Sequence, residues 1–212
     1  MTEPAIGLVL HSPEGVAYRF DPGALGLELL PTGGPGAYAR HEVLHEPADL
    51  ARWAVASRLR PGPGGLAISA EDVAAARYLR DALWHIAVAR AHGEPLPAPD
   101  LLVLNEAAAW RPPAARLAPD GGRAWRTPVS GTQILAAVAR DAVDLFSGPY
   151  ADRVRECSAR DCHLVFVDTS RPGRRRWCSM EHCGNRHKVR AHRSRRDARE
   201  APQGEPPVRL SP

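Results

Sequence analysis

All four cysteines of the chain lie in one stretch near its end, with the spacing Cys157-x4-Cys162-x15-Cys178-x4-Cys183. Two close cysteine pairs separated by a medium loop supply four thiolates, the closed tetrahedral set that holds a structural Zn²⁺. Disulfides and free thiols are the alternatives. Disulfides need an oxidising compartment, and residues 1–20 lack the basic start and apolar run of a secretion signal. The spacing therefore favours one structural zinc ion in a cytoplasmic protein.

Three histidines adjoin the cysteines: His163, His182 and His187. Imidazole also binds zinc, so three cysteines and one histidine form an alternative ligand set. Because four thiolates are already present, we expect the histidines to lie beside the metal without binding it. We expect Trp177 to pack beneath the site rather than to stack on a nucleic-acid base.

The segments around the cysteines predict how they are positioned. Leu164–Asp168 alternates like a strand, Thr169–Gly173 contains turn residues, and Arg174–Cys178 then returns as a second strand. Residues 184–199 contain no proline and a single glycine at their start, which favours a helix. The second cysteine pair would lie at the N-terminal end of this helix, where its dipole and free amides favour thiolates. Knuckle, hairpin and helix together predict a treble-clef-like zinc module.

These residues resemble the CGNR zinc finger family, named for the tetrapeptide that stands here as Cys183-Gly184-Asn185-Arg186. The resemblance extends over Arg155-x-Cys157, Cys162, Phe166-x-Asp168-Thr169-Ser170-Arg171, Arg175-Arg176-Trp177-Cys178-Ser179-Met180, Lys188 and Arg190. It implies that all four cysteines bind zinc. It also implies that the chain is similar to stress-induced bacterial transcription regulators with an N-terminal ABATE domain.

The formal net charge of +4 is unevenly distributed along the chain. Residues 151–200 contain 14 Lys and Arg against 7 Asp and Glu, a net charge of +7, whereas residues 1–150 contain 13 against 16, a net charge of −3. Lys188 is the only lysine, so part of the arginine content reflects compositional bias, but bias does not explain the clustering. The cluster predicts contact with a polyanion, most simply DNA. A solvated or protein-binding face is the alternative.

Nine residues of this basic segment are candidates for nucleic-acid contacts. Asn185 and Arg186, near the start of the helix, have the bidentate geometry that reads adenine and guanine. Because they directly follow a metal ligand, hydrogen bonding that braces the zinc knuckle is an equally open interpretation. In the helix, Arg190, Arg193, Arg195 and Arg196 would hold phosphates. The set is completed by Lys188 and by the hairpin-tip residues Arg174 and Arg175.

The first 150 residues predict an α-rich domain with short β-hairpins. Apolar pieces at residues 6–10, 16–20 and 25–30 predict a small β-meander. Periodic apolar residues and a Ser69-x-x-Asp72 capping box predict four helices, which begin near Pro47, after Ser69, near Asp100 and near Gly131. Asp120-Gly121 predicts a hairpin between residues 115–117 and 124–126. We expect an α+β fold with an ABATE-like domain over residues 1–150, the zinc module over 151–200 and a disordered tail over 201–212.

Catalytic motifs are scarce. His41, Glu42 and His45 form a His-Glu-x-x-His sequence, which marks zinc metalloproteases when it lies within a helix. Pro47 follows closely in a region that reads as loop or strand, so we expect no protease site. His85 is expected to be a packed or capping histidine. The sequence therefore predicts a protein that is not an enzyme.

The leading interpretation is a zinc-binding, DNA-binding transcription regulator whose N-terminal domain senses a ligand or forms a homodimer. The alternative is an interaction protein whose zinc module is structural and docks on an acidic partner, such as part of the transcription machinery. RNA binding and thiol-based redox sensing are further variants. No apolar run reaches the length of a membrane span.

Overall fold

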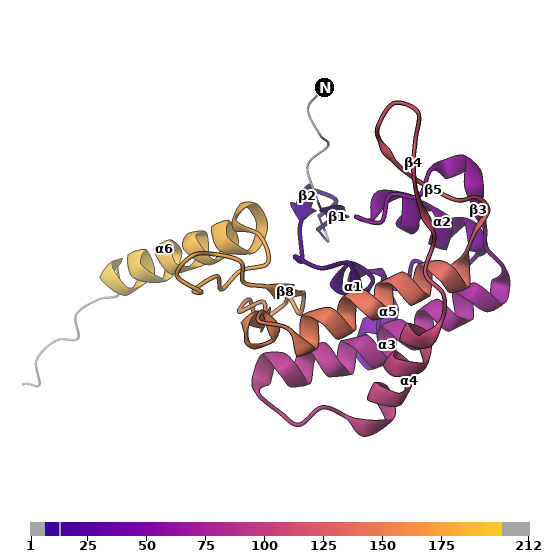
Figure 1. Cartoon of the computed structure of the whole chain (residues 1–212). Coiled ribbons are helices and arrows are strands. Elements are labelled where there is room, and N and C mark those ends of the chain that lie inside the picture. Colours follow the sequence, from indigo (N-terminus) through magenta and orange to yellow (C-terminus); the bar gives the residue numbers. More distant parts are fainter. Residues whose placement is uncertain (1–6, 13, 201–212) are drawn as a thin grey trace, which may run out of the picture.

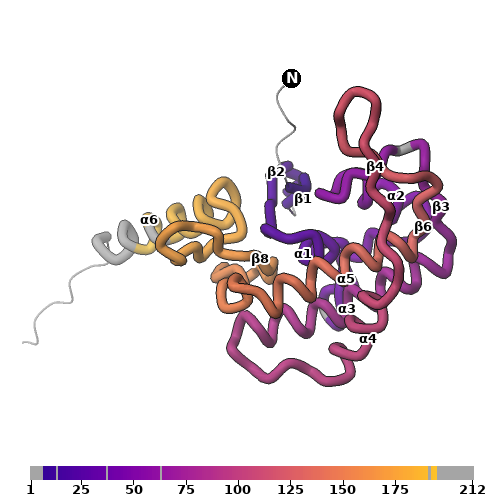
Figure 2. Tube along the Cα trace, in the orientation of Figure 1, coloured from indigo at the N-terminus to yellow at the C-terminus, as the bar shows by residue number. Residues whose placement is uncertain are grey.

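The structure is a computed structural model that describes residues 7–12 and 14–200; the side chains of Ala37, Pro63, Ala191 and residues 195–200 fall outside this description. Most of the helices form one body, and helix α6 (Asn185–Glu200) extends away from it (Figure 1). Figure 2 shows the same arrangement along the Cα trace. The predicted tail, residues 201–212, is not among the described residues. Within the described part of the chain, no helix is both long enough and apolar enough to cross a bilayer.

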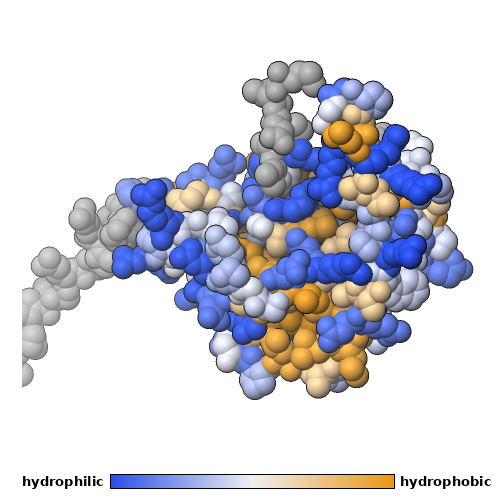
Figure 3. Space-filling model, viewed as in Figure 1, coloured by the Kyte–Doolittle hydropathy of each residue, from blue (hydrophilic) through white to orange (hydrophobic). Residues whose placement is uncertain are grey.

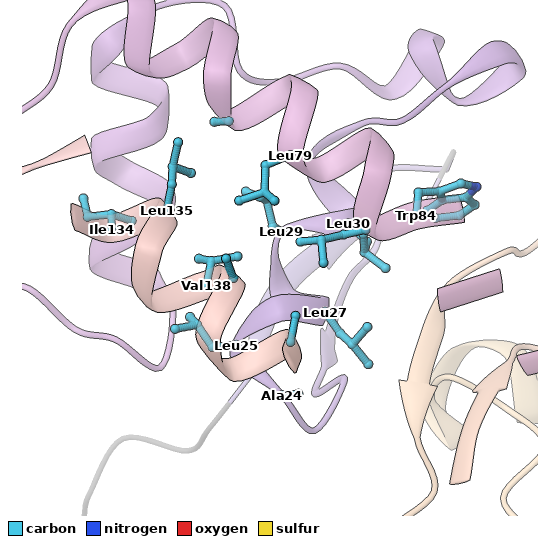
Figure 4. Packing of buried hydrophobic residues seen from close by; sticks show 14 of the residues in the cluster. Ala24, Leu25, Leu27, Leu29, Leu30, Leu79, Trp84, Ile134, Leu135 and Val138 are labelled. Atoms are coloured by element: carbon cyan, nitrogen blue, oxygen red, sulfur yellow. The ribbon is translucent and has the colours of Figure 1, made fainter. Parts of the chain in front are cut away.

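Three long helices form the centre of the body: α3 (Ala70–His92), α4 (Ala98–Ala109) and α5 (Gly131–Ser147). Their apolar faces meet in one core, to which Leu79 and Val138 contribute buried side chains (Figure 4). Helix α2 (Pro47–Ala56) packs against α3 and adds Leu50 to this core. The four predicted helices are therefore confirmed, and so is the α+β class of the chain.

Capping residues fix where the long helices begin and end. Ser69 Oγ accepts a hydrogen bond from the Asp72 N–H at 3.2 Å, and the Ser69 N–H donates to Asp72 Oδ2 at 2.9 Å, so the predicted capping box is formed. Ser130 and Gln133 make the same reciprocal pair at the start of α5. Gly93, with a φ of 71°, adopts the left-handed conformation that ends α3.

One segment predicted as a strand is a helix. Residues 25–30 were expected to complete a β-meander, but the structure forms helix α1 (Leu25–Glu28), whose four residues are all buried. A Cβ on Gly26 would lie 2.8 Å from the Cβ of Ala142 in α5, and the Gly26 N–H donates to Asp141 Oδ2 at 2.8 Å. An apolar run that is buried on all sides has no alternation that distinguishes strand from helix, so its contacts with α5 decide.

The strands are short and pair two by two. β1 (Leu8–His11) pairs antiparallel with β2 (Ala17–Phe20). β4 (Ala115–Leu117) pairs antiparallel with β5 (Arg123–Trp125), and the bounds of this second hairpin lie within one residue of those predicted. β3 (Leu66–Ala67) and β6 (Val129–Ser130) pair in parallel, which brings the starts of α3 and α5 together. Four single-turn or short helical segments complete the body: η1 (Leu30–Thr32), η2 (Gly36–His41), η3 (Pro63–Gly65) and η4 (Ala151–Arg153).

The zinc module begins with a hairpin of β7 (Val154–Glu156) and β8 (Val165–Val167). The prediction that Arg174–Cys178 returns as a strand beside β8 is wrong, because β8 pairs with β7 and the Ser158 N–H instead donates to Arg176 O at 2.9 Å. A wide helical turn, η5 (Met180–Gly184), leads directly into α6. The first cysteine pair thus lies between the strands of the hairpin, and the second lies before the helix.

Strand β8 is shared between two buried clusters. Val165 and Val167 belong to the main core of the body, whereas Phe166 packs with Phe20 and three of the cysteines. The Val167 N–H also donates to Pro22 O at 2.8 Å, outside the module. The zinc module is therefore packed onto the helical body through β8.

Candidate metal centre and nucleic-acid interface

The four cysteine sulfurs converge on one point. Their Sγ atoms all lie within 4.8 Å of one another, and in the described part of the chain no other group of three or more such side chains is close enough to hold a metal. Cys178 Sγ lies 3.6 Å from Cys162 Sγ and 3.5 Å from Cys183 Sγ. Sulfurs at about 2.3 Å from a tetrahedral Zn²⁺ lie about 3.8 Å apart. The donor set therefore fits one zinc ion with no open coordination position.

Local hydrogen bonds position the two cysteine pairs. The Cys157 N–H donates to Leu164 O at 3.0 Å and closes the loop that holds the first pair. In the second pair, the Cys178 N–H donates to Cys157 Sγ at 3.4 Å, which links the two knuckles. Gly184 follows the last ligand, and a Cβ on it would lie 2.8 Å from the sulfur of Met180. The Met180 side chain, 54% exposed, thus packs closely over the glycine that follows Cys183.

The three neighbouring histidines are engaged away from the sulfurs. His163 Nδ1 lies 2.8 Å from Glu156 Oε1, and the His187 ring packs 4.7 Å from the Trp177 ring. The His182 ring stacks on Tyr18, with 4.3 Å between centroids and 9° between planes. Burial is the main reason that the pKa of Tyr18 is raised above its ordinary value. The histidines lie beside the metal site, as predicted.

Asp168 organises the loop that returns to the second cysteine pair. Its buried carboxylate accepts hydrogen bonds from the Ser170 N–H at 2.9 Å, the Ser170 hydroxyl at 2.6 Å and the Arg175 N–H at 2.9 Å. Burial acts to raise the pKa of Asp168, but these hydrogen bonds outweigh it and hold the pKa below its ordinary value. The hydrogen bonds replace the strand pairing that was expected here.

Arg175 requires a correction. It was expected at the nucleic-acid surface, but its guanidinium lies 4.1 Å from the centre of the Phe166 ring, and its Nε donates to Trp177 O at 3.0 Å. The guanidinium also donates to Cys178 O, next to the metal site. Because this half-buried side chain is held inside the module, we assign Arg175 to the support of the zinc knuckle.

Two of the helix arginines form ion pairs with the first knuckle. Arg190 Nη2 lies 3.3 Å from Asp161 Oδ2, and the Arg186 guanidinium contacts the same oxygen. Asn185 Nδ2 donates to Glu181 O at 3.2 Å. The sequence left two interpretations of Asn185 and Arg186 open: recognition of bases and support of the zinc knuckle. The contacts in the structure are those of the second interpretation. Reading of bases by Arg186 would require release from Asp161.

Several other basic residues of the module are exposed. The exposed cations include Lys188 and Arg193 on α6 and Arg174 in the loop before it, while the side chains of Arg195 and Arg196 lie outside the description. A groove of about 530 Å³ separates the first knuckle from α6, and it is lined by four arginines, Arg160, Arg176, Arg186 and Arg190. Figure 3 shows mainly hydrophilic residues over this part of the molecule.

Sequence reasoning missed Arg160, Arg176 and Asp161 as components of this groove. Arg160 and Asp161 lie between the first two cysteines, and this position inside the metal loop was the available signal. Their closeness to α6 depends on how the two knuckles fold around zinc, which the spacing alone does not give.

The His-Glu-x-x-His sequence does not form a helical metal site. η2 ends at His41, so the two histidines do not share a helix face. Glu42 accepts two hydrogen bonds from the buried Arg80 guanidinium, at 2.9 Å each, and another from the Leu44 N–H. Glu42 therefore ties the loop to α3. His85 Nδ1 lies 3.1 Å from Asp100 Oδ2 and links α3 to α4.

Together the fold and the sulfur cluster define a protein with a helical domain and a structural zinc module. Comparison with protein families finds the ABATE model, described as "Putative stress-induced transcription regulator", over residues 23–149, and the CGNR zinc finger over residues 153–196. The chain belongs to the ABATE family and carries a CGNR zinc finger, so Cys157, Cys162, Cys178 and Cys183 form one structural zinc site. No curated protein matches the chain.

Proposed function

We propose that this protein is a DNA-binding transcription regulator of the bacterial stress response, acting by binding rather than by catalysis. The zinc module would contact DNA, and the ABATE domain would sense a ligand or form a homodimer. The family description supports a regulatory role. The observation that carries the DNA contact is the arginine-lined groove beside α6, with further exposed cations on the same helix.

The groove has the chemistry of a phosphate site. Arg160, Arg176, Arg186 and Arg190 place four guanidinium groups around it, and a hydroxyl group from Ser158 also lines it. Guanidinium groups bind phosphate oxygens in bidentate geometry. Lys188 and Arg193 would extend the contact along the backbone of the duplex. Because α6 follows Cys183 directly, zinc binding would position the whole surface.

Fluorescence anisotropy with a labelled duplex across a salt series tests this function. We expect the affinity to fall steeply with salt, and Arg190→Ala and Arg193→Ala each to lower the slope of log K against log salt by about 1. Arg116→Ala, an exposed arginine of β4 in the ABATE domain, is the matched control and should leave the slope unchanged. Absence of binding at low salt would exclude DNA contact.

A protein-docking role is the second candidate. Met180, 54% exposed, lies in η5, and Val189, 49% exposed, lies next to Lys188 and Arg190 in α6. Exposed apolar groups within a charged surface favour an acidic protein partner. Met180→Ser with Val189→Ser should then abolish capture of transcription proteins that persists after nuclease treatment. The same double variant should leave DNA affinity nearly unchanged if DNA is the partner.

A further inference from the structure

A second and larger cavity, of about 890 Å³, lies where the helical body meets the zinc module. Its walls come from the β1–β2 hairpin, from the segment that runs from η1 through α2 together with one residue of α3, and from the first zinc knuckle with one residue each of η5 and α6. The hairpin stands between α2 and the base of α6 (Figure 1). The volume falls within the range of about 300–1,000 Å³ that is typical of small-molecule sites.

Aromatic rings line one side of the cavity. The Tyr38 ring lies 4.4 Å from the Trp84 ring and 5.2 Å from the His163 ring. Val9, 57% exposed, and Val43, 53% exposed, contribute further apolar surface. A flat aromatic ligand gains both buried apolar area and ring contacts in such surroundings.

The two carboxylates at the cavity are already paired with arginines, and the guanidinium of Arg40 is not part of these pairs. Asp49 forms an ion pair with Arg52, and Asp161 forms one with Arg186. Arg40 has no carboxylate partner within the described residues, and its Nε donates to His41 Nε2 at 3.0 Å. An exposed guanidinium beside apolar rings complements a ligand that carries a negative head group on an aromatic body.

We infer that this cavity binds an aromatic carboxylate, with its ring against Tyr38 and Trp84 and its carboxylate at Arg40. The site deepens the sensing role and rests on that proposed function for its biological meaning, although binding itself requires no DNA. The zinc ligand Cys162 and the helix residue Arg186 both line the cavity. A bound ligand would therefore contact the module that carries the basic groove, and the two sites would be coupled.

Isothermal titration calorimetry with 1-naphthoate, using the zinc-loaded full chain, tests the binding site. We expect one site per chain and an affinity at least about tenfold higher than that of 1-naphthalenemethanol, which has the same rings without the charge. Arg40→Gln should remove most of this preference. No saturable binding of 1-naphthoate, or an unchanged preference in Arg40→Gln, would overturn the inference.

A blocking variant tests where the ligand lies. Val43 is 53% exposed and lines the cavity, so Val43→Trp should fill it and weaken 1-naphthoate binding at least about tenfold. Val16, 63% exposed, lies outside the cavity, and Val16→Trp is the matched control that should bind as the native chain does. Equal binding by both variants would place the ligand elsewhere and overturn the assignment.

The coupling between the cavity and the DNA-binding groove can be measured separately. If 1-naphthoate changes the affinity for DNA by some factor, DNA must change the affinity for 1-naphthoate by the same factor. We expect a factor of at least about 5 in the anisotropy assay, and calorimetry in the presence of DNA should give the same factor for 1-naphthoate. Binding of both ligands without mutual influence would overturn the coupling. Failure to bind DNA at all would contradict the proposed function and leave the calorimetric test of the cavity intact.

Discussion

Asp161 Oδ2 lies 3.3 Å from Arg190 Nη2, so an acidic residue of the first zinc knuckle neutralises part of the groove in which we place phosphate. Arg186 contacts the same carboxylate oxygen. A phosphate group that enters the groove must compete with Asp161 for both guanidinium groups. The Asp161 carboxylate therefore weakens the binding of phosphate to the groove.

Asp161→Asn should raise the affinity for DNA. Removal of the carboxylate charge frees Arg186 and Arg190, and we expect an affinity about three- to tenfold higher at moderate salt, with a salt slope steeper by about 1. The exposed ion pairs contribute about 1 kcal/mol or less to stability, so the melting temperature should change little. Anisotropy titrations check the first expectation and thermal unfolding the second. Weaker DNA binding by Asp161→Asn would show that Asp161 assists the contact by positioning α6.

Cys183→Ser should release the metal and abolish the basic surface. Three thiolates do not close the tetrahedral site, and α6 begins two residues after Cys183, so its anchor is lost together with zinc. We expect the zinc content, measured after dialysis, to fall from about one ion per chain to near zero. His187→Gln, which alters a neighbouring side chain outside the sulfur cluster, should keep the metal. Full zinc occupancy in Cys183→Ser would contradict the ligand assignment.

Glu42→Gln should destabilise the ABATE domain in a pH-dependent way. Burial acts to raise the pKa of Glu42, but hydrogen bonds from Arg80 and the Leu44 N–H, with the arginine charges, hold it below its ordinary value. Because the folded-state pKa lies below the unfolded one, the stabilisation is present above the unfolded pKa and is lost as pH falls through the folded pKa. At pH 7 the substitution leaves the buried Arg80 without its main partner and should cost about 3 kcal/mol.

Urea unfolding of Glu42→Gln and of the native chain at a series of pH values measures this difference. The gap in unfolding free energy should begin to narrow below about pH 4.3, the ordinary pKa of glutamate, and should be lost as pH falls through the lower pKa of Glu42 in the folded chain. Glu94→Gln, at an exposed glutamate beyond the end of α3, is the control. A gap that stays constant with pH would show that the carboxylate charge is not the source of the stabilisation.

Gly26→Ala should destabilise the body, because the added Cβ would lie 2.8 Å from Ala142 Cβ. Either α1 or α5 must move, and overpacking of this kind costs about 2 kcal/mol. Gly64→Ala adds a Cβ with nothing within 4 Å and should change stability by less than about 0.5 kcal/mol. Equal stability of the two variants in chemical unfolding would show that the α1–α5 contact relaxes without cost.

The elements that could be predicted from the sequence are those whose structure is determined by residues close to them in the chain. Ser69 and Gly93 define the ends of α3 through their own hydrogen bonds and backbone conformation, and the cysteine spacing defines the zinc site through ligand chemistry. The errors arose where distant residues decide. Leu25–Glu28 is helical because α5 packs against it, and Arg175 is turned inward by Asp168 and Phe166. Neither cause is visible in the neighbouring sequence.

Strand β8 gives zinc an influence beyond its own module. Val165 and Val167 fill the end of the helical core, while Phe166, between them, packs against the cysteine cluster. We expect metal loss to loosen both clusters at once, so that the chain unfolds as one cooperative unit. In a zinc-starved cell the whole chain would then be exposed to proteolysis, and the metal supply would set the amount of folded protein.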